Sequence, residues 1–195
     1  MRKIVLASKS PRRKGLLKQM GIDFIVDVSD VDEDKFSHSS PVDLVKKISK
    51  EKARIVSKRH KDAIIISADT IVVLNGKIIG KPKDKKDAKE ILMNLSGKTH
   101  IVITGFTILD TKNKKEITKT VKSKVKVKKL SRKEINNYVE TGEPLDKAGA
   151  YGIQDKGGVL IESVSGDCFN VVGLPIFDLS QSLKKFGIEV SDFWK

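Results

Sequence analysis

Residues 63–79, with the sequence AIIISADTIVVLNGKII, decide the fold. Residues 63–68 are almost wholly apolar, which is the pattern of a buried strand, and 71–74 continue that pattern. The dipeptide Asn75-Gly76 is typical of a two-residue hairpin turn, so 77–79 are predicted to return as a second strand. This stretch is the strongest strand signal in the chain, and it ends in a hairpin.

Strands and helices alternate on both sides of this stretch. Before it, the pattern predicts a strand at 4–7, a helix from Pro11 to Gly21, a strand at 24–28 and a helix that starts at Ser40-Pro41. After it, we expect a helix from Asp84 to Gly97, strands at 100–109 and 121–129, a helix at 131–140 with a Ser131/Glu134 capping box, a hairpin made of 159–164 and 169–172, and a last helix near Pro175. The interleaving predicts an α/β fold with a mixed sheet. We find no repeat and no linker, so we expect one domain over residues 1–195.

The chain is strongly basic. It has 39 Lys and Arg residues against 25 Asp and Glu residues, for a formal net charge of +14. Clustered cations can bind nucleic acid, but here they are mostly Lys mixed with acids, and aromatic residues that would stack on bases make up only 5% of the chain. The densest stretch, 119–129, alternates Lys with other residues and predicts a strand with a solvated face. We therefore expect no nucleic-acid partner, while a polyanionic small ligand such as a nucleotide stays compatible.

Composition also limits the compartment. With 38% hydrophobic residues the chain can build a core, and no uncharged run approaches the ~18 apolar residues of a membrane span. Charges at Lys9, Arg12 and Arg13 interrupt the apolar N-terminal run, so we expect no signal peptide. The single cysteine, Cys168, has no internal partner for a disulfide or a zinc cluster. We expect a cytoplasmic protein without a membrane partner.

The first candidate site is Ser8-Lys9-Ser10-Pro11-Arg12-Arg13, between the first predicted strand and helix. A helix start presents unpaired N–H groups and a partial positive charge, and two hydroxyls and two guanidiniums add to it. The segment predicts a phosphate-binding loop. The alternative, an ordinary Ser-Pro helix cap with two solvated arginines, stays open.

The second candidate site is Asp69-Thr70, at the carboxyl end of the apolar strand. Sites in α/β folds gather at such ends, and a carboxylate there can hold Mg²⁺ or act as a base toward water. Lys52 and Lys81 can meet phosphate charges, and Asp32 and Glu33 can supply further metal ligands. The alternative is structural, because Asp is a common turn former and Lys is usually a solvated surface charge.

A P-loop is excluded. Residues 96–99, SGKT, match the end of that motif, but Leu92 stands where the motif requires glycine, and a predicted helix precedes the segment instead of following it.

Several further blocks complete a family pattern. They are LASKSPRR (6–13), ADT (68–70), GKP (80–82), LSGKTH (95–100), GEP (142–144), DKAGAYGIQ (146–154) and VGLP (172–175). In this order the set resembles the Maf family of nucleoside triphosphate pyrophosphatases. The resemblance implies an α/β structure with a mixed sheet and two lobes around a cleft, related to the inosine triphosphate pyrophosphatases, and often a homodimer.

The resemblance also implies residue roles. Asp69 matches the catalytic acidic residue, and whether it accepts a proton or binds metal stays open. Ser8, Arg12 and Arg13 match the phosphate-binding loop. The remaining matches are Lys52 and Lys81 around the triphosphate, and Glu33 with Asp69 around a divalent Mg²⁺ or Mn²⁺ ion.

The specificity positions are Arg12, Thr70 and Gln154. Thr70 and Gln154 resemble the branch of the family that acts on dTTP and UTP. A Gln amide can pair with both the carbonyl and the N–H of uracil or thymine. The resemblance therefore implies hydrolysis of pyrimidine triphosphates, modified ones included, to monophosphate and pyrophosphate, which cleans the nucleotide pool. The alternative is a regulator of septum formation that uses nucleotide binding as a switch.

Overall fold

β3 (Ala63–Leu74) is one uninterrupted strand of 12 residues that continues through Asp69. Asn75-Gly76 turns the chain into β4 (Lys77–Ile79), which pairs antiparallel with β3 as predicted. Both turn residues have positive φ angles, 50° and 77°, as the favoured Asn-Gly hairpin turn requires. The computed structural model describes residues 2–36 and 39–194, and the side chains of Glu33 and Asp34 lie outside that description.

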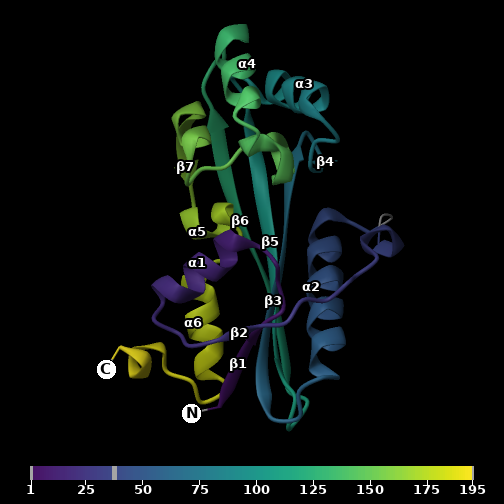
Figure 1. Ribbon diagram of the computed structural model, residues 1–195, viewed down its shortest axis with the longest axis vertical. Coiled ribbons are helices and arrows are strands. Elements are labelled where there is room, and N and C mark those ends of the chain that lie inside the picture. The colour runs from purple at the N-terminus through teal and green to yellow at the C-terminus, as the bar shows by residue number, and fades with distance from the viewer. Residues whose placement is uncertain (1, 37–38, 195) are drawn as a thin grey trace. The chain divides into compact units, whose positions relative to one another are not determined.

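Most of the remaining elements agree with the sequence prediction, and the segments that differ, 24–28 and 159–172, are described below. The other strands are β1 (Lys3–Leu6), β2 (Ile25–Val26), β5 (Thr99–Asp110), β6 (Glu116–Val127) and β7 (Ile161–Ser165). The helices are α1 (Pro11–Gln19), α2 (Pro41–Ser57), α3 (Lys85–Leu95), α4 (Arg132–Glu140), α5 (Cys168–Val172) and α6 (Ile176–Lys184) (Figure 1). The strands form one sheet in the order β2-β1-β3-β5-β6-β7, with β4 beside β3. Parallel pairs (β1 with β2 and β3) and antiparallel pairs (β3 with β4, β6 with β7) confirm a mixed sheet.

The chain folds into two compact units. The first contains Met1–Asp69, Thr104–Val121 and Gly173–Lys195, and the second contains Thr70–Ile103 and Lys122–Val172. Three strands, β3, β5 and β6, contribute residues to both units.

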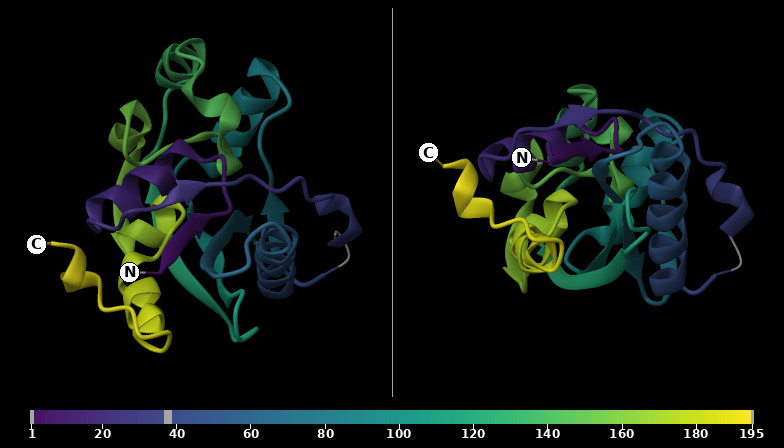
Figure 2. Two further views of the ribbon diagram at one scale, coloured as in Figure 1. Left: turned by 60° about the horizontal axis from the view of Figure 1, so that its bottom comes forward. Right: turned by 90° about the horizontal axis from the view of Figure 1, so that it is seen from below.

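In the first unit, helices cover both faces of β1 and β3. Figures 1 and 2 show α2 on one side of these strands and α1 with α6 on the other. The α2 side is closed by a cluster that joins Ala53 and Val56 of the helix to Val5, Ile65 and other strand residues. A parallel sheet covered on both faces is buried on both faces, which explains why β1 and β3 are apolar almost throughout.

In the second unit, α3 and α4 pack together over the sheet. Leu92 and Leu95 of α3 and Tyr138 and Val139 of α4 belong to one buried cluster, which also contains Val72 and other strand residues. The capping box of α4 is present as predicted: the side chain of Ser131 accepts from the backbone of Glu134, and the Glu134 side chain accepts from the backbone of Ser131. The capping box and the buried cluster stabilise the unit that carries Gln154.

The predicted hairpin of 159–164 and 169–172 is wrong. Only Ile161–Ser165 forms a strand, and it pairs with β6. The backbone N–H of Phe169 donates to the Asp167 side chain at 2.7 Å, a cap that starts helix α5 where the hairpin's second strand was expected. The strand predicted at 24–28 is likewise shorter, with only Ile25–Val26 paired to β1.

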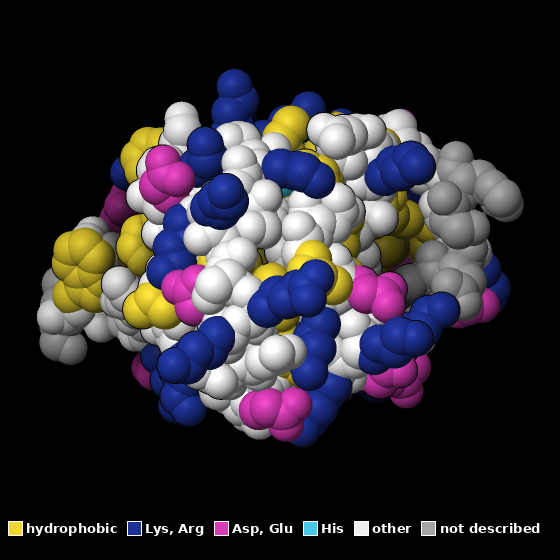
Figure 3. Space-filling model, turned by 90° about the horizontal axis from the view of Figure 1, so that it is seen from above, with side chains coloured by type: hydrophobic (Ala, Val, Ile, Leu, Met, Phe, Trp, Pro, Cys, Tyr) yellow, Lys and Arg dark blue, Asp and Glu magenta, His cyan; other side chains and the backbone are white. Residues whose placement is uncertain are grey.

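The basic residues lie on the surface among acids. Along β6, Lys122 and Lys124 are exposed while Ser123 and Val125 are buried, which confirms the predicted solvated face. Figure 3 shows Lys and Arg side chains spread over one face, with Asp and Glu side chains between them. Within residues 2–36 and 39–194, no helix is both long and apolar enough to cross a membrane.

Candidate active site

The loop between β1 and α1 is fixed by its own side chains. Ser10 caps α1 by accepting from the backbone of Arg13, and Pro11 occupies the first turn. The hydroxyl of Ser8 accepts from the backbone N–H of Ser10 at 3.2 Å and from Nη1 of Arg13 at 3.3 Å. Nε of Arg13 donates to the carbonyl of Gly173 at 2.9 Å. A capped helix start with ordered cations is suited to an anion.

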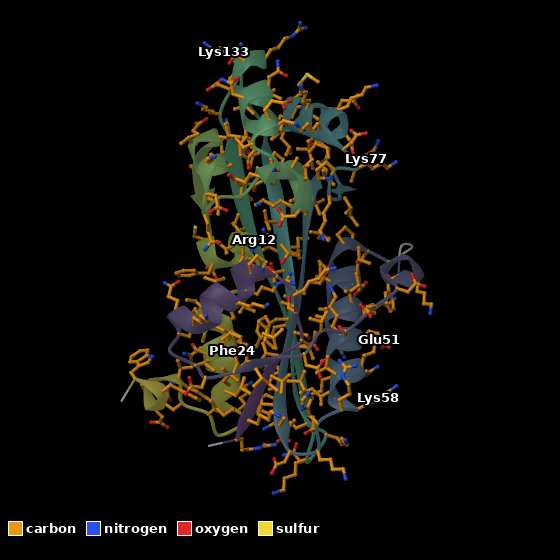
Figure 4. The ribbon with its side chains drawn as sticks, viewed as in Figure 1. Arg12, Phe24, Glu51, Lys58, Lys77 and Lys133 are labelled. Carbon is orange, nitrogen blue, oxygen red and sulfur yellow. The ribbon has the colours of Figure 1, made fainter. Side chains whose placement is uncertain are left out.

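Arg12 is the other guanidinium of this loop. It stands directly after Pro11 at the N-terminal end of α1 (Figure 4). The first turn of α1 contains no acidic residue, so the positive end of the helix and both guanidiniums add to the same positive field. The segment that the sequence predicts to bind phosphate therefore lies at the capped start of α1, in the first unit.

Strand register brings the second candidate motif to this loop. β1 runs parallel to β3, with Leu6 opposite Ile66, and the N–H of Ala7 donates to the carbonyl of Ile66 at 2.7 Å. β1 ends at Leu6, whereas β3 continues to Leu74, so the expectation that Asp69 lies at the carboxyl end of its strand is wrong. Ser8 and Asp69 nevertheless follow the last pairing of the two strands by two and three residues. The structure thus brings together two motifs that are 61 residues apart in the chain.

Lys52 of α2 and Asp69 of β3 form an ion pair. Nζ of Lys52 lies 2.8 Å from Oδ1 of Asp69, and the two side chains are only 14% and 11% exposed. A short contact between two mostly buried side chains holds the carboxylate in one orientation, and its remaining exposure leaves it accessible to a small reactant. A held and accessible carboxylate can accept a proton from water.

Helix α2 is placed by contacts one turn before Lys52. The hydroxyl of Ser67 donates to the carbonyl of Ser49 at 2.6 Å, and the Ser49 hydroxyl lies 3.1 Å from that of Thr107. A Cβ atom at Gly105 would lie 2.7 Å from the backbone of Val45, so α2 lies directly against β5. The sheet therefore determines the position of Lys52 through the backbone of its helix.

The other candidate residues belong to the second unit. Thr70 is half-buried and follows Asp69 in β3, while Lys81 is exposed just after β4. Gln154 is exposed in the loop between α4 and β7. The backbone N–H of Gly149 donates to the carbonyl of Gly80 at 3.0 Å, which ties the Lys81 segment to the loop that carries Gln154.

The metal ligands predicted at this site are incompletely described. The side chain of Glu33 lies outside the described residues. Among the side chains that the structure describes, no group of three or more His, Cys, Asp or Glu residues could hold a metal ion. Of the other predicted ligands, Asp69 pairs with Lys52, and Asp32 is exposed with Oδ2 3.7 Å from Nζ of Lys35.

Comparison with known proteins places the chain in a family. The model of the family described as "Maf-like protein" matches residues 3–186. The chain belongs to the Maf family. The dTTP/UTP pyrophosphatase of Dictyoglomus turgidum is 51% identical to this Maf chain over 189 residues, 96% of this chain and 98% of that protein. Those of Methanococcoides burtonii and Bacillus anthracis are 51% and 47% identical over 193 and 191 residues, each covering 98% of this chain and 99% of the relative.

Solved structures support the fold of this Maf protein. The structure of a HAM1 protein from Coxiella burnetii superposes with a TM-score of 0.54 at 14% identity, over 95% of this chain and 100% of that one. At this identity the likeness concerns the fold alone. It agrees with the mixed α/β architecture expected from the sequence.

The pairing of Lys52 with Asp69 was not foreseen from the sequence of this Maf chain, which indicated only that Lys52 could meet phosphate. A signal for it exists. Ser67 and Asp69 are two residues apart in a strand and share a face, and Ser49 and Lys52 are three apart in a helix and share a face. When α2 packs against β3 so that Ser49 meets Ser67, the same arrangement brings Lys52 to Asp69.

Proposed function

We propose that this chain hydrolyses dTTP and UTP to the nucleoside monophosphate and pyrophosphate. The observation that carries the proposal is the Lys52–Asp69 pair on β3, the neighbour of β1, because the Ser8–Arg13 loop begins just after β1 ends. A binding protein gains little from a carboxylate beside a polyphosphate unless a metal is present, whereas an enzyme needs one to activate water. The Maf relatives described above are named as pyrophosphatases of these substrates, which favours the enzyme over the septum regulator.

Cations of this chain bind the triphosphate in the proposal. Ser8, Arg12 and Arg13 take phosphate oxygens at the start of α1, and Lys52 and Lys81 add two ammonium groups. The phosphorus under attack is screened by negative oxygens, so these groups must offset that charge before a nucleophile can approach. The Ser8 and Gly173 contacts of Arg13 hold it in place, so less freedom is lost when substrate binds.

Asp69 activates the water. Its carboxylate accepts a proton from the water, whose oxygen forms a new bond to a phosphorus of the α–β anhydride. The bond from that phosphorus to the bridging oxygen breaks, and the monophosphate and pyrophosphate separate. Lys52 keeps the carboxylate oriented through its 2.8 Å contact.

A divalent metal, Mg²⁺ or Mn²⁺, belongs to the proposal. Mg²⁺ is often held by one or two carboxylates together with water and substrate phosphates, and a site built on Asp69 with Glu33 fits that mode. When bound, such an ion would neutralise phosphate charge and lower the cost of the leaving pyrophosphate. The carboxylate of Asp69 would then serve as ligand, as base, or as both.

Base selection falls to Arg12, Thr70 and Gln154 in the proposal. Uracil and thymine present a carbonyl acceptor beside an N–H donor, and the amide of Gln154 can satisfy both. Gln154 is exposed at the surface of its unit, as a residue that meets a ligand must be.

The proposal takes residues 1–195 as one nucleotide pyrophosphatase domain that acts as a homodimer in the cytoplasm, where it removes excess or modified pyrimidine nucleotides. It requires no nucleic-acid or membrane partner.

The test is pyrophosphate release from dTTP, UTP, CTP, dATP, GTP and 7-methyl-GTP, with Mg²⁺ or Mn²⁺ and with chelator. We expect metal-dependent release from dTTP and UTP. Release from 7-methyl-GTP alone would overturn the substrate assignment, and no release from any nucleotide would overturn the enzyme assignment in favour of a nucleotide-binding regulator.

A further inference from the structure

The segment that carries Gln154 is held at both of its ends by two side chains outside it. Before Gln154, the backbone N–H of Gly152 donates to the hydroxyl of Tyr138 at 3.1 Å. After Gln154, the N–H groups of Lys156 and Gly157 donate to the two carboxylate oxygens of Glu143 at 3.2 and 3.0 Å. Gln154 therefore lies between two anchored points.

The two anchoring side chains are bonded to each other. The hydroxyl of Tyr138 donates to Oε1 of Glu143 at 2.8 Å, the same oxygen that accepts from Gly157. Burial, together with this hydrogen bond, raises the pKa of Tyr138 well above its usual value, so the hydroxyl keeps its proton. The Tyr138 hydroxyl thus accepts from Gly152 at the start of the segment and donates to Glu143, which holds the end of the segment.

The anchors stand on a rigid frame. Tyr138 lies in α4, is only 5% exposed and belongs to the buried cluster of the second unit. Glu143 starts a 3₁₀-helix after Gly142, and its own carbonyl accepts from Nζ of the buried Lys147 at 2.7 Å. Tyr138 cannot follow a displaced loop without disturbing the core, and Glu143 is held at its backbone by Lys147.

Two glycines show how closely the segment closes on these anchors. A Cβ atom at Gly157 would lie 2.4 Å from the Tyr138 hydroxyl oxygen and 2.6 Å from the carbonyl oxygen of Gly152. At Gly158 it would lie 2.7 Å from the carbonyl oxygen of Ile153. The loop is therefore closed at its base, while the side chain of Gln154 is exposed at its tip.

We propose that Tyr138 and Glu143 are positioning residues that set the orientation of Gln154 for recognition of the pyrimidine base. This inference rests on the proposed function. An amide that must match one donor and one acceptor discriminates only when its backbone is fixed, and a fixed loop loses little entropy on binding. The hydrogen-bonded frame provides that fixation without touching the ligand.

The test uses Tyr138→Phe and Glu143→Gln in the full chain. Tyr138→Phe keeps the buried ring and removes the bonds to Gly152 and Glu143. Glu143→Gln keeps the length of the side chain but turns one acceptor into a donor that faces a backbone N–H. Glu140→Gln is the matched control. Glu140 is the last residue of α4, and its side chain pairs with Lys85 and not with the Gln154 segment.

The readout is the ratio of kcat/KM for UTP to that for GTP. We expect each anchor variant to lower this ratio about tenfold, the effect of about one hydrogen bond, mainly through KM for UTP. In the background of Gln154→Ala, the same changes should lower it no further, because they act through Gln154. Glu140→Gln should keep the ratio of the unmodified enzyme.

An unchanged ratio of kcat/KM for UTP to that for GTP in a folded anchor variant would overturn the positioning role. So would a further tenfold fall of this ratio when an anchor change is added to Gln154→Ala. Amide hydrogen exchange in the unmodified protein gives a second test that needs no variant: Gly152 and Gly157 should exchange more slowly than Gln154, and equal rates would contradict the anchoring. Failure of the proposed function is distinguishable, because the unmodified enzyme would then release no pyrophosphate from UTP.

Discussion

In the proposed function the chemistry depends on Asp69, and replacing its charge tests this directly. An amide in place of the carboxylate would keep an oxygen that can accept from Lys52 but would lose the ability to take a proton from water. We expect Asp69→Asn to lower kcat/KM for UTP about 10²- to 10⁴-fold while the protein still folds and unfolds cooperatively. Pyrophosphate release and thermal unfolding check both halves of the prediction.

The matched control for this variant is Asp62→Asn. Asp62 forms an ion pair with Arg2 at 3.1 Å, its side chain is 59% exposed, and it lies at the start of β3, away from Lys52. It should retain activity. Turnover at the unmodified rate in Asp69→Asn would remove Asp69 from the catalytic role.

His100 is a buried histidine that makes stability depend on pH. It is 1% exposed, its Nε2 atom lies 2.8 Å from the hydroxyl of Tyr151, and burial lowers its pKa to about 4 from 6.5. The unfolded chain therefore binds this proton first as the pH falls. The titration of His100 costs no stability above about pH 6.5. As the pH falls from about 6.5 to about 4, it lowers the free energy of unfolding by about 3 kcal/mol in total.

Chemical denaturation at several pH values checks this expectation. His100→Gln should flatten the loss of stability between about pH 6.5 and 4, relative to the unmodified protein. Tyr151→Phe should retain that loss, because the ring of His100 stays buried. Equal pH dependence in His100→Gln and the unmodified protein would contradict the prediction.

At the scale of elements, the docking of α2 on the sheet places Lys52, and Gly105 permits that docking. Gly105→Ala would put a Cβ atom 2.7 Å from the carbonyl carbon and oxygen of Val45. Backbone atoms cannot swing aside as a side chain can, so α2 must shift. We expect a loss of about 1–3 kcal/mol in the free energy of unfolding, together with a fall in kcat/KM as Lys52 moves from Asp69.

Gly15→Ala is the matched control for Gly105→Ala. Gly15 lies inside α1, and a Cβ atom there would meet nothing within 4 Å. Alanine should stabilise α1 by about 0.5–1 kcal/mol and leave kcat/KM unchanged. A Gly105→Ala protein with the stability and activity of the unmodified chain would show that α2 is not held as closely as the structure indicates.

Elements were predictable where local chemistry determines them. Ser10-Pro11, Ser40-Pro41 and the Ser131/Glu134 capping box each start a helix in the structure, because caps act within a few residues. Helix α5 was mistaken for a strand, because Cys168–Val172 is mostly apolar, contains two β-branched valines and is too short for periodicity to decide. The helix cap at Asp167 and the pairing of β7 with β6 determine the helical structure of this segment instead.

For the candidate site, the sequence indicated which residues to consider, and the structure added the contacts between some of them. The Ser8–Arg13 loop and Asp69 follow from their motifs, and the register of β1 on β3 brings them together. The Lys52–Asp69 pair joins residues that are distant in sequence. The hydrogen bonds of Tyr138 and Glu143 with the Gln154 segment join residues that a loop separates. Such contacts depend on how whole elements dock, which local pattern does not specify.

At the scale of the whole molecule, the net charge of +14 should assist the capture of a triphosphate. Raising monovalent salt from about 0.01 to about 0.1 M shortens the screening length from about 30 to about 10 Å. We expect kcat/KM for UTP to fall several-fold over this range, with kcat nearly constant, because long-range attraction acts before binding. Steady-state kinetics at constant metal concentration check this, and a kcat/KM that does not depend on salt would contradict it.

The division of the chain into units also sets the order in which they can be completed during synthesis. Every segment of the second unit has been synthesised once Val172 has been added, whereas the first unit still lacks its final segment from Gly173 onward. That segment contains α6 and the carbonyl that accepts from Arg13. A nascent chain can therefore finish the part that carries Gln154 before the part that carries Asp69. A product truncated at Val172 would lack the carbonyl that accepts from Arg13 of the Ser8–Arg13 loop.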